Sequence, residues 1–161
     1  MPEQEKTPIA PYMAIGLSTA ITGIAHRKHI KHNLANIEEA IHAFISMVNI
    51  NMPVKMIALA EGALTGFTDE IFDLPHKLAA NELFIEIPGE ETEWLGRLAK
   101  LYDTYIIGQC KARWPEVMAD RFFNTLFIID PSGSVVHKAP KNHIWCRERS
   151  CTPHDIYDRW V

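Results

Sequence analysis

Short apolar runs alternate along this chain with two longer segments whose apolar residues recur every three or four positions. The short runs have the length and the apolar content that are typical of buried strands. They are residues 12–18, 54–60, 104–112, 122–130 and 135–139. The order strand, helix, strand, helix, strand, strand favours an α/β fold in which part of the sheet is antiparallel.

The two segments with the longer period predict amphipathic helices. We expect Asn33 to cap the first helix, because its side chain can accept from the free N–H groups of the first turn, and Pro53 to end it. Pro88 and Gly89 precede the second helix, whose acidic first turn suits the positive end of a helix dipole. The apolar stripes consist of Leu34, Ile37, Ile41, Phe44, Ile45 and Val48 in the first helix, and of Trp94, Leu95, Leu98 and Leu101 or Tyr102 in the second.

Length and composition limit the class of protein. The 161 residues are enough for a single domain, and a net charge of −4 gives no electrostatic reason to expect nucleic acid or a membrane surface as partner. No apolar run reaches the ~20 residues of a membrane helix. The N-terminal segment carries acids and prolines where a secretory signal needs a basic start and an apolar stretch. Three cysteines are a sparse, odd set, so we expect reduced thiols and a cytoplasmic location.

Glu61 is the first candidate for chemistry, because it stands where an apolar strand emerges into a loop. In open α/β sheets, ligands bind outside the carboxyl ends of strands. Taken alone, the local sequence favours a solvated loop glutamate. Lys141 and Glu148 follow the last predicted strand, and taken alone each fits an exposed, charged loop.

The basic segment HRKHIKH (26–32) holds three histidines at a spacing of three. Two of them could share one helical face, but the interleaved basic residues would repel a cation, and no cysteine or carboxylate is near in sequence. We therefore interpret the segment as a solvated loop or helix start and expect neither a metal nor a cofactor.

Four segments of the chain resemble the nitrilase superfamily of carbon–nitrogen hydrolases. AEGALTGF (60–67) is similar to the box in which a glutamate ends a strand, and FNTLFIIDPSGSVVHKAPKNHIW (123–145) to the segment that leads to the catalytic lysine, which matches Lys141 and not Lys138. NLANIEEAI and IPGEETEWLGRLAKLYDTYIIGQ resemble the two family helices and the strand that follows, and IPGEET is close to aliphatic amidases.

The resemblance implies an αββα sandwich and hydrolysis of a small aliphatic amide or nitrile through a Cys–Glu–Lys site, in a protein that forms homo-oligomers. In that comparison Glu61 is the base, partly buried with its pKa raised by desolvation, and Lys141 stabilises the oxyanion. Glu148 stands at the distance from the lysine at which relatives place a second glutamate that helps to hold the site. The nature of the substrate, amide or nitrile, stays open.

The nucleophilic cysteine of the family stands in a box such as C-(D/E)-x-x-(F/Y)-P-E well after the lysine, and no such box follows Lys141 here. Cys110, Cys146 and Cys151 do not match it, so we interpret them as structural thiols. We therefore expect residues 1–161 to be the N-terminal portion of one hydrolase domain, truncated before the nucleophile, with an incomplete sandwich and no activity alone. The alternative is a non-catalytic binding or assembly protein of the same fold.

Overall fold

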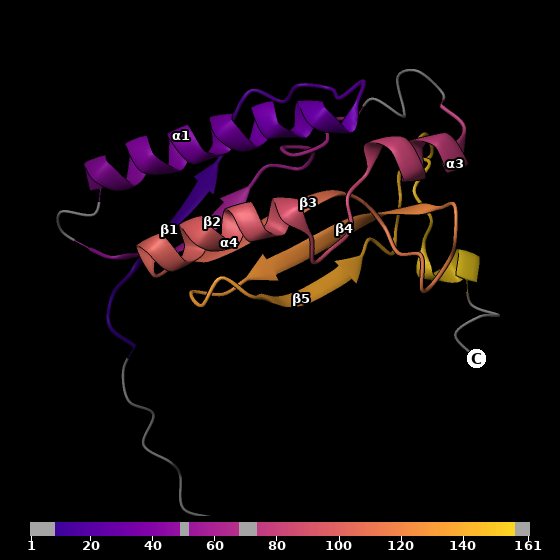
Figure 1. The fold of residues 1–161 in the computed structure, drawn as a ribbon. Coiled ribbons are helices and arrows are strands. Elements are labelled where there is room, and N and C mark those ends of the chain that lie inside the picture. The colour runs from indigo at the N-terminus through magenta and orange to yellow at the C-terminus, as the bar shows by residue number, and fades with distance from the viewer. Residues whose placement is uncertain (1–8, 49–51, 68–73, 157–161) are drawn as a thin grey trace, which may run out of the picture.

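A computed structural model describes residues 9–48, 52–67 and 74–156 (Figure 1). Residues 1–8, the segment 49–51 that precedes Pro53, residues 68–73 and the last five residues lie outside the described residues. The elements in chain order are β1 Met13–Leu17, η1 Arg27–His29, α1 Ile30–Val48, β2 Val54–Leu59, α3 His76–Leu78, η2 Ala79–Leu83, α4 Glu90–Tyr102, β3 Tyr105–Arg113, β4 Phe122–Ile129, β5 Val135–Pro140 and η3 Pro153–Ile156.

The described strands form one sheet in which spatial order equals chain order, β1-β2-β3-β4-β5. β1 and β2 pair in parallel, as do β2 and β3, whereas β3–β4 and β4–β5 are antiparallel. The predicted α/β class with partly antiparallel pairing is therefore confirmed. The parallel strands are joined through helices, and the antiparallel ones through shorter connections, as the geometry of each pairing requires.

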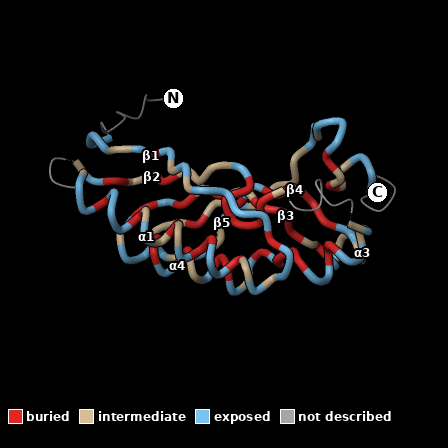
Figure 2. Tube along the Cα trace, turned by 90° about the horizontal axis from the view of Figure 1, so that it is seen from above, coloured by how far each residue is buried: buried red, intermediate tan, exposed pale blue. Residues whose placement is uncertain are grey.

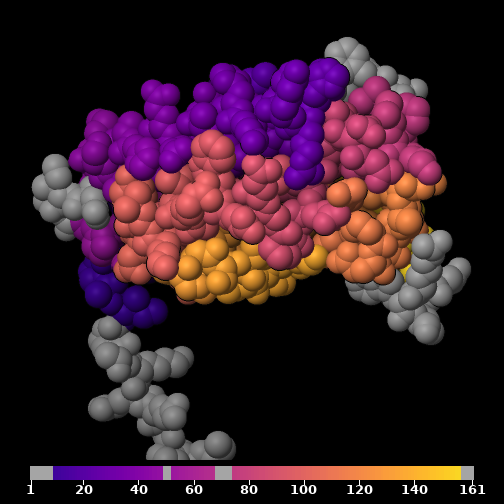
Figure 3. Space-filling view, in the orientation of Figure 1, coloured from indigo at the N-terminus to yellow at the C-terminus, as the bar shows by residue number. Residues whose placement is uncertain are grey.

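Helices α1 and α4 cover one face of this sheet, as the view from above in Figure 2 shows, and they pack side by side without a break in Figure 3. On that face Ile15, Ile57, Ile106 and Ile129 stand in register across four strands, and each is at most 7% exposed. The buried stripe of α1 that packs on them repeats every three or four residues and consists of Ile30, Leu34, Ile37, Ile41 and Ile45.

Neither of the two long helices, α1 and α4, lies on the opposite face of the sheet, which we call the open sheet face (Figure 2). Strand neighbours point to opposite faces, so Tyr105 and Leu126, at 43% and 40% exposure, lie on this side. A sheet whose two long helices share one face agrees with the incomplete α/β fold that the resemblance implies.

Two details of the predicted helices were wrong. Helix α1 begins at Ile30, so Asn33 lies inside its first turn and is 1% exposed. Its amide does not cap the helix but donates to the carbonyls of Thr22 and Leu64, at 3.0 and 2.8 Å, and ties α1 to two loops. Phe44, which was expected in the buried stripe, is 40% exposed. The core-facing stripe is narrower than the apolar periodicity indicated.

Helix α4 approaches the β4–β5 turn closely at two glycines. A Cβ added at Gly96 would lie 2.4 Å from the carbonyl oxygen of Gly133, whose φ is +90°. Asp130 shapes the same turn by accepting from the backbone N–H groups of Ser132 and Ser134, at 2.9 and 3.1 Å. This contact fixes how far α4 lies from the antiparallel strands β4 and β5.

Candidate functional site

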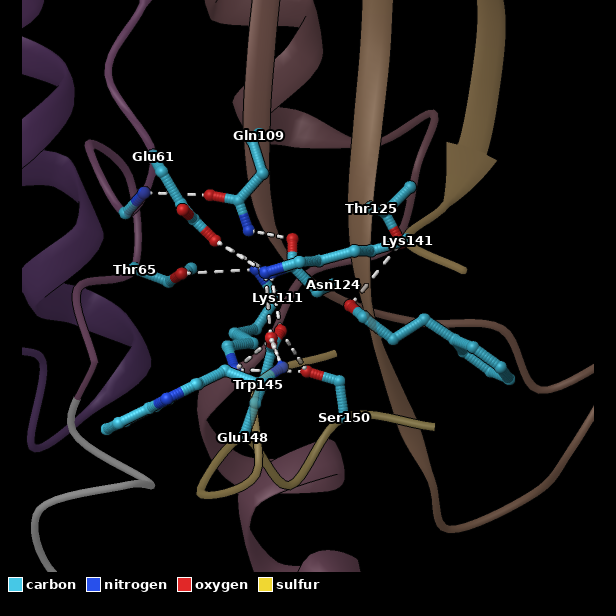
Figure 4. Close-up of polar contacts among 12 residues, drawn as sticks. Glu61, Thr65, Gln109, Lys111, Asn124, Thr125, Lys141, Trp145, Glu148 and Ser150 are labelled. Atoms are coloured by element: carbon cyan, nitrogen blue, oxygen red, sulfur yellow. Dashed lines mark hydrogen bonds and ion pairs between the residues drawn. The ribbon is translucent and has the colours of Figure 1, made fainter. Parts of the chain in front are cut away.

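Side chains from four parts of the chain converge beside the ends of β2 and β5 (Figure 4). Glu61 follows β2 by two positions, Asn124 lies on β4, Lys141 follows β5 directly, and Glu148 belongs to the loop beyond. The backbone N–H of Lys141 donates to the carbonyl of Asn124 at 2.7 Å, which fixes the start of its side chain against β4.

The chain turns at Gly62 immediately after Glu61. Gly62 has a φ of +77°, a left-handed conformation that favours glycine, and its N–H donates to Gln109 Oε1 at 2.7 Å. An added Cβ there would lie 2.7 Å from the ring of Phe67. The turn holds Glu61 at the strand end against β3.

The three predicted site residues lie in direct contact. Lys141 Nζ is 2.9 Å from Glu148 Oε2 and 3.5 Å from Glu61 Oε1, so one ammonium group bridges two carboxylates. The predicted convergence of these side chains is confirmed. Their catalytic role is not tested by the distances and stays a prediction.

Asn124 joins the two carboxylates from the side of the sheet. Its Nδ2 donates to Glu61 Oε1 at 3.0 Å and to Glu148 Oε1 at 2.5 Å, while its Oδ1 accepts from Gln109 Nε2. The residue is 2% exposed. Each polar atom of its amide therefore has a partner, and its orientation is fixed from three directions.

Lys111 lies behind Glu148 on β3 and is fully buried. Its Nζ donates to Ser150 Oγ at 3.0 Å, and Ser150 Oγ donates to Glu148 Oε1 at 3.0 Å. The direct distance from Lys111 Nζ to Glu148 Oε1 is 3.7 Å, and the backbone N–H of Lys111 donates to Thr65 Oγ1 at 3.2 Å. The cluster thus contains two carboxylates and two ammonium groups.

The surroundings hold Glu148 in its ionised form. Burial would raise its pKa, but hydrogen bonds from Lys141 and Asn124, the charge of Lys111 and a hydrogen bond from Ser150 together lower it to about 2. The hydrogen bond to Glu148 in turn raises the pKa of Lys141, against a smaller opposing effect of burial. Near neutral pH this pair is therefore fully charged.

Glu61 and Lys141 border a hollow of about 520 Å³ whose other lining residues are Leu59, Gln109, Asn124, Leu126, Ala139 and Pro140. The Glu61 side chain is 51% exposed and that of Lys141 36%, whereas that of Glu148 is 5% exposed. The Glu61 side chain is thus half exposed at the end of β2, and its partial burial in a full site stays a prediction. Glu61 lies at the rim of this hollow, whereas Glu148 does not line it and contacts Lys141 from behind.

The cysteines lie in three different settings. Cys110 is fully buried in β3, and burial raises the pKa of its thiol. Burial also raises the pKa of the half-buried Cys151, and Cys146 is exposed in the loop that follows Lys141. A raised pKa lowers the thiolate fraction at neutral pH, which opposes nucleophilic use of Cys110 and Cys151.

The basic segment 26–32 forms a short 3-10 turn and the first turn of α1, as predicted. Arg27 donates to the carbonyl of Phe84 at 2.9 Å and pairs with the buried Glu91 at 2.8 Å. Over the ranges that the structure describes, no group of three His, Cys, Asp or Glu side chains could hold a metal ion. In those same ranges, no helix is both long and apolar enough to cross a membrane.

Lys111 and Asn124 are functional candidates that sequence reasoning missed. Each stands inside a strand whose other residues are largely apolar, and a charged or amide group in such a run is unusual. That composition was the available signal. It could not show which partners the two side chains would meet, because those hydrogen-bond partners are 15 to 63 positions away and are brought close only by the sheet.

Comparison with known proteins agrees with this arrangement. Residues 18–158 match the family described as carbon-nitrogen hydrolase. The chain is 33% identical over 100 residues to omega-amidase NIT2-B of Xenopus laevis, an alignment that covers 60% of this chain and 35% of that protein. The chain therefore spans about a third of the length of the curated relatives it matches.

Solved structures share the fold at low sequence identity. A crystal structure of N-terminal amidase superposes with a TM-score of 0.59 at 15% identity, over 74% of this chain and 26% of that one. Nit3 of Saccharomyces cerevisiae, a member of branch 10 of the nitrilase superfamily, superposes with a TM-score of 0.56 at 18% identity, over 76% of this chain and 42% of that one.

Proposed function

This chain belongs to the carbon–nitrogen hydrolase family, and from that premise we propose that it forms part of a site that hydrolyses small aliphatic amides to a carboxylic acid and ammonia. The observation that carries the proposal is the bridge of Lys141 Nζ between Glu61 and Glu148. The names of the relatives, omega-amidase and N-terminal amidase, support an amide over a nitrile. Nitriles remain the second class to test.

In this proposal Glu61 moves protons. It would take the proton of an attacking thiol, give a proton to the leaving nitrogen and then activate the water that releases the acid. Its position at the rim of the hollow favours that role, because the carboxylate is accessible to a substrate. Lys141 would supply fixed positive charge where the tetrahedral oxyanion develops. Glu148 would hold Lys141 in place from below.

In this proposal the thiol comes from a cysteine other than Cys110, Cys146 and Cys151, because none of these three stands in a box like that of the family nucleophile. The polypeptide that brings it would also cover the open sheet face and so bury Glu61. In this proposal the chain is the N-terminal portion of one hydrolase domain. The cytoplasmic location and the homo-oligomeric state stay predictions.

The proposed hydrolase activity is tested by expressing a longer part of the gene. The coding sequence that follows codon 161 is expressed together with this chain, and ammonia release is measured on short aliphatic amides and nitriles. We expect amide hydrolysis that a thiol-blocking reagent abolishes. Glu61→Gln and Lys141→Met should each lower kcat/KM by about 10²-fold or more.

Glu39→Gln and Lys100→Met are the matched controls, since both residues are exposed on helices away from the hollow. Full activity in Glu61→Gln or Lys141→Met would remove these residues from the site. A folded product that hydrolyses neither amides nor nitriles, or a gene without a downstream cysteine box, would favour the alternative of a binding or assembly protein.

A further inference from the structure

Lys111 is a buried lysine to which the proposed chemistry gives no task. We propose that Lys111 is a positioning residue of the site, whose ammonium group holds the Glu148 carboxylate in place from behind and leaves Lys141 able to serve Glu61 and the substrate. This inference rests on the function proposed above.

The contacts place Lys111 and Lys141 on different oxygens of one carboxylate (Figure 4). Glu148 Oε1 accepts a hydrogen bond from Ser150 Oγ at 3.0 Å and lies 3.7 Å from Lys111 Nζ. Glu148 Oε2 accepts hydrogen bonds from Lys141 Nζ at 2.9 Å and from the backbone N–H of Trp145 at 3.4 Å. The Ser150 hydroxyl therefore links the Lys111 ammonium by two hydrogen bonds to Oε1, the oxygen that Lys141 does not contact.

The number of charges shows why a second ammonium matters. With Lys141 alone, two carboxylates would share one positive group, and the buried Glu148 would hold it more strongly than the exposed Glu61. Lys111 offsets part of the negative charge of Glu148, so Glu148 attracts Lys141 less strongly and Lys141 can interact more with Glu61. A buried ammonium is unfavourable unless it is paired, and among the described residues Glu148 lies within ion-pair distance of Lys111.

Lys138 provides a matched control. It is also a strand lysine with its Nζ over an aromatic ring, 4.4 Å from Trp114, as Lys111 lies 5.7 Å from Phe122. Its Nζ donates to the carbonyl of Ile87 at 2.9 Å, outside the cluster. Replacing either lysine by methionine removes a charge of the same kind from the same sheet, and only one of the two charges faces Glu148.

The first experiment needs no catalysis. The Glu148 side-chain carboxyl is followed by ¹³C NMR in the 161-residue protein as pH is lowered, with its signal assigned by Glu148→Gln. We expect Lys111→Met to raise the pKa of Glu148 from about 2 by one unit or more, a tenfold change in its proton-binding constant. Lys138→Met should leave it unchanged.

Where Lys111→Met does not fold, as circular dichroism would show, Ser150→Ala decides the matter. It removes only the relaying hydroxyl and should raise the same pKa by a smaller amount. In the active, extended protein, Lys111→Met should lower kcat at least tenfold with KM nearly unchanged, and should move the acid limb of the pH profile to higher pH. A lysine needed only for folding would not move that limb.

An unchanged Glu148 titration in Lys111→Met, or in Ser150→Ala where that variant decides, would overturn the inference and leave the hydrolase proposal standing. A shifted titration in a protein that hydrolyses no amide or nitrile would do the reverse. The two proposals can therefore fail separately.

Discussion

The substitution Asn124→Asp tests the charge arrangement of the site with almost no change in shape. The amide Nδ2 that donates to Glu61 and Glu148, at 3.0 and 2.5 Å, becomes a carboxylate oxygen. Two unit charges ~3 Å apart repel by roughly 5 kcal/mol at an effective dielectric constant of ~20. The contact with Glu148 is buried and bears most of this repulsion, because Glu61 is half exposed and screened by water.

The variant can relieve that repulsion by taking up a proton, which limits the loss of stability. Holding an aspartate neutral at pH 7 costs about 4 kcal/mol when its unfolded pKa is ~3.9. We therefore expect the free energy of unfolding to fall by about 3–4 kcal/mol at pH 7. The folded-state pKa of the new carboxyl is raised, so the loss appears as pH rises above ~3.9 and is about 1 kcal/mol or less at pH 4.

Urea unfolding followed by tryptophan fluorescence at pH 4 and pH 7 measures both values. Asn81→Asp is the matched control, because Asn81 also donates to a carboxylate, Asp120 at 2.8 Å, but on the exposed surface. It should cost less than ~1 kcal/mol. A loss below ~1 kcal/mol for Asn124→Asp at pH 7, or an equal loss at both pH values, would refute the reasoning.

Three further predictions concern other parts of the molecule. The 161-residue chain should release no ammonia from amides or nitriles, because burial raises the pKa of Cys110 and Cys151; release above a blank that a thiol reagent abolishes would contradict this. Glu148→Gln should lower the free energy of unfolding by about 3 kcal/mol above pH 5, and this loss should shrink as pH falls toward 2. The pKa of Glu148 is lowered to about 2 in the folded protein, so the residue stabilises the fold only while the carboxyl of the unfolded chain is ionised. Denaturant titrations across that range measure the loss, and a loss that does not depend on pH would count against the ion pairs. Gly96→Ala should lower stability by ~1–3 kcal/mol in thermal unfolding, because its Cβ would lie 2.4 Å from the Gly133 carbonyl; an unchanged melting temperature would show that α4 can move away without cost.

The success of sequence reasoning followed the range of the interactions involved. Glu61 and Lys141 were predicted because the segments around them resemble two boxes of the family; taken alone, each residue fits a charged loop. Asn33 was assigned to the wrong place because its side chain bonds to carbonyls 11 and 31 positions away, and local capping rules do not include such partners. The exposure of Glu61 likewise depends on what covers the sheet, which no local pattern encodes.

The matching of strand order to chain order has a consequence for how the site comes into being. A chain emerging from the ribosome adds strands at one advancing edge, from β1 toward β5. Glu61 is made early, but Lys141, 80 positions later, completes its ion pair only after β3, β4 and β5 have docked. Pairing of the two charges therefore requires the strands from β2 to β5 to be in place, and a probe at Glu61 would report when this part of the sheet has assembled.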